Sequence, residues 1–204
     1  MARAFANGEF YGKTELTSVF AEWHGMLVTV NASTFDVQKE LLRGVNINAG
    51  VTNWGEPDIF GRTYLIIKKN GTLTYSSDPL KETDVDISLV GFFPIIVDKK
   101  NVISQFDGTY PHKGVPNPQQ VIYQHSNGQI GFLTCEGRIG GQTGLTVEQC
   151  CNILLELNVN FAYLLDGGGS TTTCINGLMV NTPSDSTGER PVKDFLYFKE
   201  EYFE

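Results

Sequence analysis

Three Asn-Gly pairs between short apolar segments constrain the fold of this chain more than any other feature. They lie at Asn70-Gly71, Asn127-Gly128 and Asn176-Gly177. Asn-Gly suits the positive backbone angles of a type I′ turn, which joins two antiparallel strands by a very short connection. We therefore predict three hairpins: Tyr64–Lys68 with Thr72–Tyr75, Gln120–His125 with Gln129–Cys135, and Thr172–Ile175 with Leu178–Val180.

Only two segments have the apolar spacing of an amphipathic helix. Thr146–Leu157 is the stronger, because Thr146 and Gln149 form a capping box before its apolar face. Residues 14–24 have the same periodicity, with Thr14 as the expected cap. Many hairpins and few helices predict an α+β fold, in which a mostly antiparallel, strongly twisted sheet packs with its hairpins on two main helices.

The remaining strands are predicted from short apolar runs. A short, exposed strand is expected at Val102–Phe106 and a loop at Asp107–Pro118, whereas Leu41–Val51 fits strand or loop equally. Buried strands are expected at Met26–Val30, Val85–Phe93, Pro94–Val97, Phe161–Leu165 and Phe195–Phe198. With no repeat or linker in view, we expect one domain over residues 1–204, which the abrupt start suggests was cut from a longer protein.

Charge and composition argue against several classes of protein. The net charge is −8, and no basic cluster exceeds the Lys68-Lys69 and Lys99-Lys100 pairs, so we expect no nucleic-acid partner. No apolar run approaches the ~18 residues of a membrane span, so no membrane insertion is expected. The four cysteines form no CxxC pair, which argues against zinc and favours reduced core thiols.

One segment carries most of the chemical information. Leu164-Leu165 reads as the end of a buried strand that delivers Asp166 into Gly167–Gly169 and then into Ser170–Thr173. Three consecutive glycines suit a backbone that a ligand approaches closely, and the N–H groups of such a loop converge readily on an anion. An acid beside an anion cradle indicates chemistry on a phosphorylated or otherwise anionic substrate. The alternative is a turn aspartate that caps its own loop.

Three stretches together resemble the phosphodiester glycosidase family, which includes an enzyme that removes N-acetylglucosamine from a phosphodiester. They are VNASTF at Val30–Phe35, CEGR at Cys135–Arg138 and LLDGGGSTTTCINGLMVNTPSDSTGERPV at 164–192. The resemblance is strongest over residues 129–198. Two positions depart from the family pattern: Glu136 stands where an aspartate is usual, and Gln119 stands where an arginine is usual.

The resemblance implies a role for each candidate site residue. Asp166 and Glu136 are the expected catalytic acid, base or nucleophile, and Arg138 and Arg190 are the expected phosphate clamp. The residues expected to bind substrate are Asn31, Arg138, Gly167, Gly168, Gly169, Ser170, Thr171, Asn181 and Arg190. Asp166, Glu136 and Ser170 are hard oxygen donors that suit calcium, but their spacing matches no calcium loop, so no metal or other cofactor is predicted.

The expected function is hydrolysis of a sugar-1-phosphate diester in a cell-surface glycopolymer, such as a teichoic acid or phosphopolysaccharide. The expected partner is a phosphorylated cell-surface glycan, and assembly into a homo-oligomer or a virion stays open. A chain without a secretion signal fits a phage tail or baseplate protein at the host surface, with a cytoplasmic location as the alternative. The alternative function is a glycan-binding or structural tail module weakened in catalysis by the changes at Gln119 and Glu136.

Overall fold

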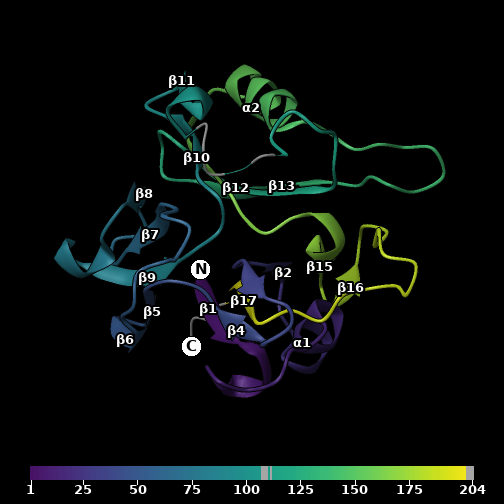
Figure 1. Ribbon diagram of the computed structural model, residues 1–204, viewed down its shortest axis with the longest axis horizontal. Helices are drawn as coiled ribbons and strands as arrows, with labels where there is room; N and C mark the ends of the chain where they lie inside the picture. The colour runs from purple at the N-terminus through teal and green to yellow at the C-terminus, as the bar shows by residue number, and fades with distance from the viewer. Residues whose placement is uncertain (107–109, 111, 201–204) are drawn as a thin grey trace.

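The computed structural model describes residues 1–106, 110 and 112–200, and it confirms the mostly antiparallel α+β class. The strands form three five-stranded sheets and one short hairpin instead of a single sheet, and every pairing between named strands of the described chain is antiparallel. Figure 1 shows the sheets arranged around a common centre. The loop expected at Asp107–Pro118 lies partly outside the described residues.

The first sheet has the order β1-β17-β2-β15-β16 and carries α1 (Thr17–Trp23). Its strands are β1 (Ala2–Phe5), β17 (Asp194–Phe198), β2 (Val28–Asn31), β15 (Thr173–Ile175) and β16 (Leu178–Met179). The two ends of the chain thus pair with each other through β1 and β17. The hairpin of β15 and β16 across Asn176-Gly177 is confirmed.

The second sheet has the order β6-β5-β9-β7-β8 and contains the confirmed hairpin across Asn70-Gly71. Its strands are β6 (Val51–Trp54), β5 (Asn46–Asn48), β9 (Val85–Leu89), β7 (Tyr64–Lys68) and β8 (Leu73–Ser76). The ambiguous segment Leu41–Val51 supplies β5 together with β4 (Leu41–Leu42), which pairs with β3 (Phe35–Asp36).

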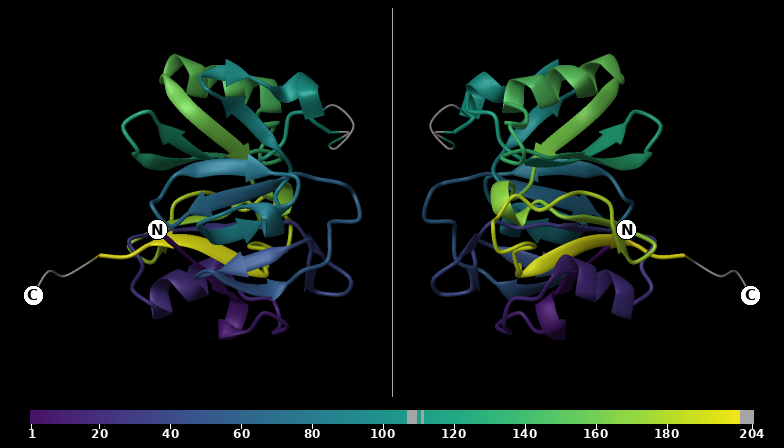
Figure 2. Two further views of the ribbon diagram at one scale, coloured as in Figure 1. Left: turned by 90° about the vertical axis from the view of Figure 1, so that its left-hand side faces the viewer. Right: turned by 90° about the vertical axis from the view of Figure 1, so that its right-hand side faces the viewer.

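The third sheet has the order β11-β10-β14-β12-β13 and carries α2 (Val147–Glu156). Its strands are β11 (Lys100–Asn101), β10 (Pro94–Val97), β14 (Val159–Leu164), β12 (Gln119–His125) and β13 (Ile130–Cys135). The predicted capping box of Thr146 and Gln149 is present, and β12 and β13 form the third predicted hairpin. Figure 2 shows α2 at one end of the molecule and α1 at the other, with the sheets layered between them.

One buried cluster joins all three sheets. It takes Val30 and Leu196 from the first sheet, Leu65 from the second, and Ile122 and Tyr163 from the third, all fully buried. A second cluster packs α2 on the third sheet, and its members include Cys150, Cys151 and Leu154. Because apolar burial is the main driving force of folding, the shared cluster holds the strand ends of different sheets close together.

The sequence-based assignment missed β3, most of β6 and β11, and it is wrong in three further places. The first is β1, which was not predicted; it carries the buried Arg3. The second is the start of α1, which begins at Thr17 without a cap from Thr14. The third is Val102–Phe106, where Ile103–Phe106 forms a 3₁₀ helix and Val102 is buried.

The cap of α1 comes from a distant part of the chain. Glu189 Oε1 accepts a hydrogen bond from Ser18 N at 3.0 Å, and the Ser18 hydroxyl donates to the same carboxylate. Thr14 instead donates to Glu40 Oε1 at 3.4 Å. A carboxylate near the first turn of a helix satisfies its free N–H groups, and here only tertiary packing could supply it.

Candidate active site

Asp166 follows β14 and lies where the first and third sheets meet. Its backbone N–H donates to Ala32 O at 3.0 Å, and Leu165 N donates to Gln120 O at 2.9 Å. Asn31 binds both sides of the loop, because Nδ2 donates to Asp166 O at 2.7 Å and Oδ1 accepts from Thr172 N at 3.0 Å. Asn31 is 0% exposed, so it positions Asp166 and is not the sugar contact that the resemblance implied.

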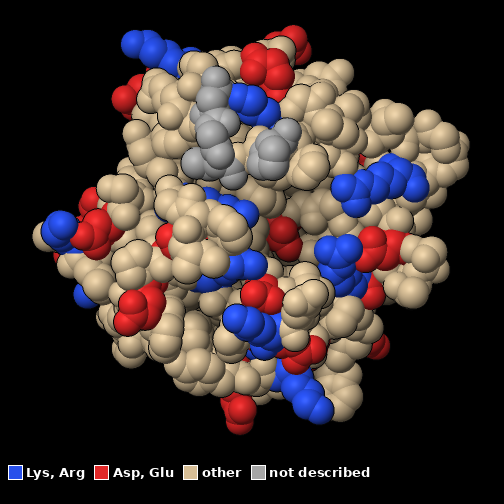
Figure 3. All heavy atoms as spheres, in the orientation of Figure 1, with Lys and Arg blue, Asp and Glu red and all other residues tan. Residues whose placement is uncertain are grey.

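The Asp166 carboxyl group is partly dehydrated. Burial raises the pKa of Asp166 to about 6, although the Ser170 hydroxyl, the Arg190 charge, the Gly167 amide and the Arg62 charge all lower it. A carboxyl group that changes protonation near neutral pH is suited to proton transfer. The side chain remains half-buried. Figure 3 shows a hollow near the middle of this face, with an acidic group at its floor and basic groups on both flanks.

The glycine loop satisfies most of its own amides. Gly168 N donates to Pro118 O at 2.9 Å, Ser170 N to Gly167 O at 3.2 Å, and Thr171 N to Gly168 O at 3.1 Å. The expected cradle of amides for phosphate is therefore largely used within the protein. Ser170 and Thr171 are also buried, at 0% and 2% exposed, so they support the loop and do not line an open anion site.

The glycines are required because two guanidinium groups approach the loop backbone. A Cβ atom on Gly169 would overlap Arg190 Nη2 and the Asp185 carboxylate. Gly168 has φ of +61°, and a Cβ there would lie 3.4 Å from Arg138 Nη1. Since only glycine combines this backbone freedom with the absence of a side chain, the loop lets both guanidinium groups lie against its backbone, and Arg190 acts electrostatically on Asp166.

The two predicted clamp arginines differ in how they are held. Arg190 forms an ion pair with Asp185, with Nη2 to Oδ2 at 2.7 Å and Nε to Oδ2 at 2.9 Å. Arg138 donates from Nε and Nη2 to Asn117 Oδ1 at 3.1 and 2.6 Å, and it forms no ion pair with the residues that the structure describes. Arg138 thus keeps an unneutralised charge beside the loop.

Two other predicted residues face the loop that follows β16. Glu136 Oε1 accepts from Thr182 N at 2.5 Å, and in the described chain no hydrogen bond joins it to Asp166. Asn181 receives Thr173 N on Oδ1 at 2.7 Å and donates to Thr171 O at 3.0 Å. Asn181 therefore closes the connection between the glycine loop and β15, and its role in binding sugar stays a prediction.

Two residues near Asp166 were missed from the sequence. Arg62 acts electrostatically on Asp166, and burial lowers the pKa of its own guanidinium. Tyr110 is half-buried; burial, followed by the Asp166 charge, raises the pKa of its hydroxyl. Neither lies in a recognisable motif. Arg62 precedes β7 in a Gly-Arg-Thr stretch, and only the packing of the second sheet against the third brings it to Asp166.

Gln119, which replaces the usual arginine, has a structural role. It is 1% exposed, and Nε2 donates to Leu145 O at 3.0 Å. If Gly167 carried a Cβ atom, that atom would lie 3.6 Å from the side-chain oxygen of Gln119, so the two residues are neighbours. The side chain therefore lies behind the glycine loop, where it supplies no charge.

The structure shows little that suits a metal. Among residues 1–106, 110 and 112–200, no three His, Cys, Asp or Glu side chains gather as a metal site. The four cysteines are free, and burial raises the pKa of the Cys150, Cys151 and Cys174 thiols to about 12. Within the same described part of the chain, no helix has the length and apolar character to cross a membrane.

Solved structures with the same fold include enzymes and proteins of unassigned role. The catalytic domain of zebrafish N-acetylglucosamine-1-phosphodiester alpha-N-acetylglucosaminidase, auto-inhibited by its pro-peptide, matches with a TM-score of 0.84 at 22% identity, over 98% of this chain and 73% of that one. A hypothetical protein from Synechocystis matches with a TM-score of 0.70 at 13% identity, over 95% of this chain and 55% of that one. These likenesses establish the fold.

Sequence comparisons agree with the structural ones. An uncharacterized SPbeta prophage-derived protein of Bacillus subtilis (strain 168) is 28% identical over 199 residues, which cover 92% of this chain. The match covers 30% of that relative, so this chain spans less than a third of its length. The family model for phosphodiester glycosidase matches residues 24–199, which include β2, the glycine loop and Arg190. The chain therefore belongs to the phosphodiester glycosidase family.

Proposed function

We propose that the protein is a hydrolase that cleaves the bond between a sugar C1 and the phosphate of a phosphodiester-linked cell-surface glycopolymer. The observation that carries the proposal is the placement of a carboxyl group with a pKa near 6 beside Arg138 and Arg190 on one glycine loop. Membership of the phosphodiester glycosidase family supports the same reaction class. The polymer class is inferred from the anionic chemistry that these cations would bind.

In the proposed reaction, Asp166 acts as a general base. Its carboxylate takes a proton from water, the water oxygen bonds to the sugar C1, and the C1–O bond to phosphate breaks. The bonding electron pair leaves with the phosphate oxygen, so the products are a free sugar and a phosphomonoester. Arg138, which has no ion-pair partner among the described residues, would neutralise the charge that develops on phosphate.

The proposal predicts how activity depends on pH. Because the base must be ionised, kcat/KM should rise as pH increases through about 6, the pKa of Asp166. Arg190 lowers this pKa, so Arg190→Gln should move the rising limb to higher pH. The measurement is the release of sugar between pH 4 and 8 by each variant.

Arg138→Gln is the matched comparison for this profile. It removes the same charge but lies on the phosphate side of the loop, beside Gly168. We expect it to lower kcat/KM at every pH and to leave the pH of the rising limb unchanged. Activity that falls through pH 6 would show instead that Asp166 acts as an acid.

The direct test is an assay of sugar release from a panel of phosphodiester-linked glycans. The panel should include N-acetylglucosamine 1-phosphodiesters, the substrate type named for the similar zebrafish enzyme, and teichoic acids. Release of a sugar and an equal amount of phosphomonoester supports the proposal. Release of a sugar 1-phosphate in place of a free sugar would contradict the site of bond cleavage.

One structural observation favours a second candidate, a glycan-binding module without turnover. Glu136 Oε1 accepts from Thr182 N, and Gln119 is buried without the positive charge of the arginine that is usual at its position. These two departures favour weaker catalysis and weaker phosphate binding. In the same assay, tight binding of phosphorylated glycans by the wild type without any product would select this alternative.

We further propose that the protein acts at the host cell surface as part of a phage particle. The support is the SPbeta prophage origin of a relative that is 28% identical. Detection of the chain in purified particles by mass spectrometry would test this location, and its absence from intact particles of a producing strain would contradict it.

A further inference from the structure

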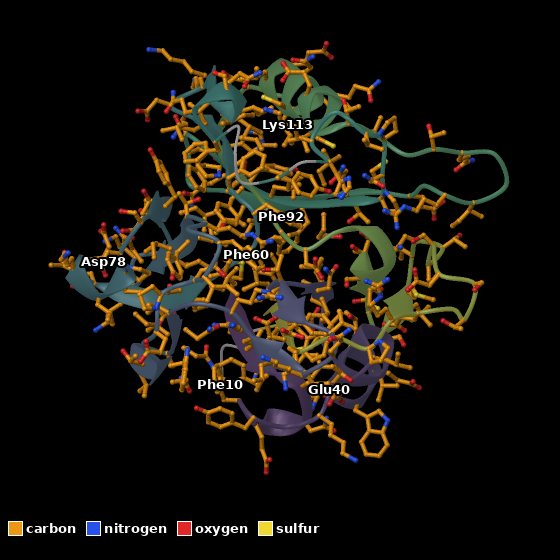
Figure 4. The ribbon with its side chains drawn as sticks, viewed as in Figure 1. Phe10, Glu40, Phe60, Asp78, Phe92 and Lys113 are labelled. Atoms are coloured by element: carbon orange, nitrogen blue, oxygen red, sulfur yellow. The ribbon has the colours of Figure 1, made fainter. Side chains whose placement is uncertain are left out.

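A row of guanidinium groups and aromatic rings lies beside Asp166, and the reaction above does not use it. We call Arg43, Phe60, Arg62 and Phe92 the cation–ring row. The Arg43 and Arg62 Cζ atoms lie 4.8 and 4.9 Å from the centre of the Phe60 ring, and Arg62 Cζ lies 5.1 Å from that of Phe92. Tyr110 extends the row, with its ring centre 4.3 Å from that of Phe92. Figure 4 shows Phe60 and Phe92 close together near the centre of the molecule.

The loop that carries Phe60 and Arg62 is held in place by a buried aspartate. Asp58 Oδ2 accepts from Phe60 N at 3.1 Å and from Arg62 N at 3.2 Å, and Asp58 N donates a hydrogen bond to the Tyr64 hydroxyl oxygen at 2.8 Å. Asp58 is 7% exposed. These bonds order the row without a ligand, which lowers the entropic cost of binding one.

The row carries positive charge that the protein only partly neutralises. Arg62 forms no ion pair within the described part of the chain; its Nη1 donates to the neutral Thr34 hydroxyl at 3.0 Å. Arg43 has a loose ion pair, with Nη2 to Asp36 Oδ2 at 3.7 Å. Phe60 is 53% exposed. A guanidinium group stacked on a ring still offers N–H groups at its edge to phosphate. In Arg62 one of these groups, Nη1, already binds Thr34.

Hydrogen bonds and a short stretch of backbone connect the row to the glycine loop. Arg62 binds Thr34, which lies two residues after Ala32, and the carbonyl of Ala32 receives the Asp166 N–H. Arg138 and Arg190 approach the same loop at Gly168 and Gly169. The row therefore supplies one cation close to Asp166, Arg62, in addition to the two at the glycines.

We propose that the cation–ring row binds a second phosphate of the substrate, one repeat unit away from the phosphate at the cleaved bond. This inference rests on the proposed function and specifies its substrate as a chain of repeated sugar–phosphate units. A second phosphate would pair directly with the guanidinium groups of Arg43 and Arg62, whereas a neutral glycan would offer them no charge. The row thereby distinguishes a polymer from a substrate with a single phosphodiester.

A binding experiment tests the row without requiring turnover. Asp166→Asn protein would be titrated by calorimetry with oligomers of N-acetylglucosamine 1-phosphate that contain one or three phosphodiester linkages, and with neutral N-acetylglucosamine tetramer. We expect the three-linkage oligomer to bind about tenfold more tightly than the one-linkage oligomer. Addition of Arg43→Gln or Phe60→Leu should remove most of that difference and leave the one-linkage affinity unchanged.

Lys81→Gln is the charge-matched control. Lys81 is 84% exposed on its side chain and pairs with Asp78 at the opposite side of the second sheet from the row. The Lys81→Gln substitution should change neither the affinity for the one-linkage oligomer nor that for the three-linkage oligomer. Equal affinities for the two oligomers, or equal losses on both in Arg43→Gln and Phe60→Leu, would overturn the proposal.

Turnover separates this inference from the proposed reaction. Hydrolysis of both oligomers by wild-type protein, with the three-linkage oligomer unaffected by Arg43→Gln and Phe60→Leu, would overturn the row and leave the reaction standing. Row-dependent binding of the three-linkage oligomer without any sugar release would support the row and reject the reaction.

Discussion

Asp166→Asn is expected to lower kcat/KM by about 10³-fold, because loss of a general base removes roughly 10²–10⁴-fold of rate. Asparagine has the same shape and keeps an acceptor for the Gly167 amide and the Ser170 hydroxyl, but it takes no proton from water. The measurement is sugar release at pH 7.5, where the wild-type carboxyl is ionised. Turnover within about threefold of the wild type would contradict a catalytic role for Asp166.

The same substitution is expected to stabilise the protein at pH 7.5. The folded pKa of about 6 lies above the ordinary value of 3.8, so ionisation of Asp166 opposes folding at neutral pH. Each pKa unit corresponds to about 1.4 kcal/mol, which predicts a gain of about 1–3 kcal/mol in the free energy of unfolding. The gain should shrink as pH falls through 6 and disappear below 4, where the carboxyl is protonated in both states. Urea unfolding at several pH values measures it.

Asp78→Asn is the control for both effects. Asp78 lies at the periphery, and the Lys81 side chain holds the pKa of its carboxyl below the ordinary value. Activity should be unchanged, and stability at neutral pH should not rise. A similar gain in stability from both substitutions would indicate that net negative charge, and not burial of Asp166, is responsible.

Asp194→Ala is expected to cost about 3–5 kcal/mol of stability, the range for loss of one partner of a buried ion pair. Asp194 and Arg3 are both fully buried on their side chains, with an Nη2 to Oδ2 distance of 2.6 Å. Asp194 also accepts from the N–H and hydroxyl of Ser33, at 2.9 and 2.6 Å. Ser33 lies two residues beyond Asn31, so the loss should also loosen the support of Asp166 and reduce activity.

Chemical denaturation of the wild type and Asp194→Ala gives the stability difference directly. Glu82→Ala is the matched control, because it breaks the Lys68–Glu82 ion pair at 2.9 Å, whose side chains are 19% and 34% exposed. An exposed pair of this kind contributes about 0–1 kcal/mol. Similar losses in the free energy of unfolding in the two variants would show that burial does not increase the contribution of the Arg3–Asp194 pair to stability.

Local sequence rules predicted the hairpins and α2 because their signals act over a few residues. Asn70-Gly71, Asn127-Gly128 and Asn176-Gly177 each join paired strands as expected, and the capping box of α2 is present. The missed β1 has no such signal; its four residues become a strand because β17, at the other end of the chain, offers them a partner. Pairing over such a distance has no local signature.

In the candidate site, too, local motifs predicted some features and only the tertiary structure revealed others. Asp166, Gly168, Gly169, Arg138 and Arg190 were identified from motifs, and the structure brings them together around one loop. Their catalytic and binding roles stay predictions. The resemblance implied open donors in Asn31 and Asn181, but their amides are already used as backbone clamps. A motif indicates which residues gather, whereas hydrogen-bond geometry decides which atoms remain available.

The sequence by itself determined the antiparallel α+β class, the family, and the acid and glycines of the loop after β14, because turn residues, periodicity and motifs act within short segments. The tertiary structure alone decided the environment of that acid. Burial at the junction of sheets raises the pKa of Asp166, Asp185 forms an ion pair with Arg190, and the segment before β7 brings Arg62 into electrostatic range of Asp166. Desolvation and charge pairing depend on which distant segments pack together, and no short stretch of sequence specifies that.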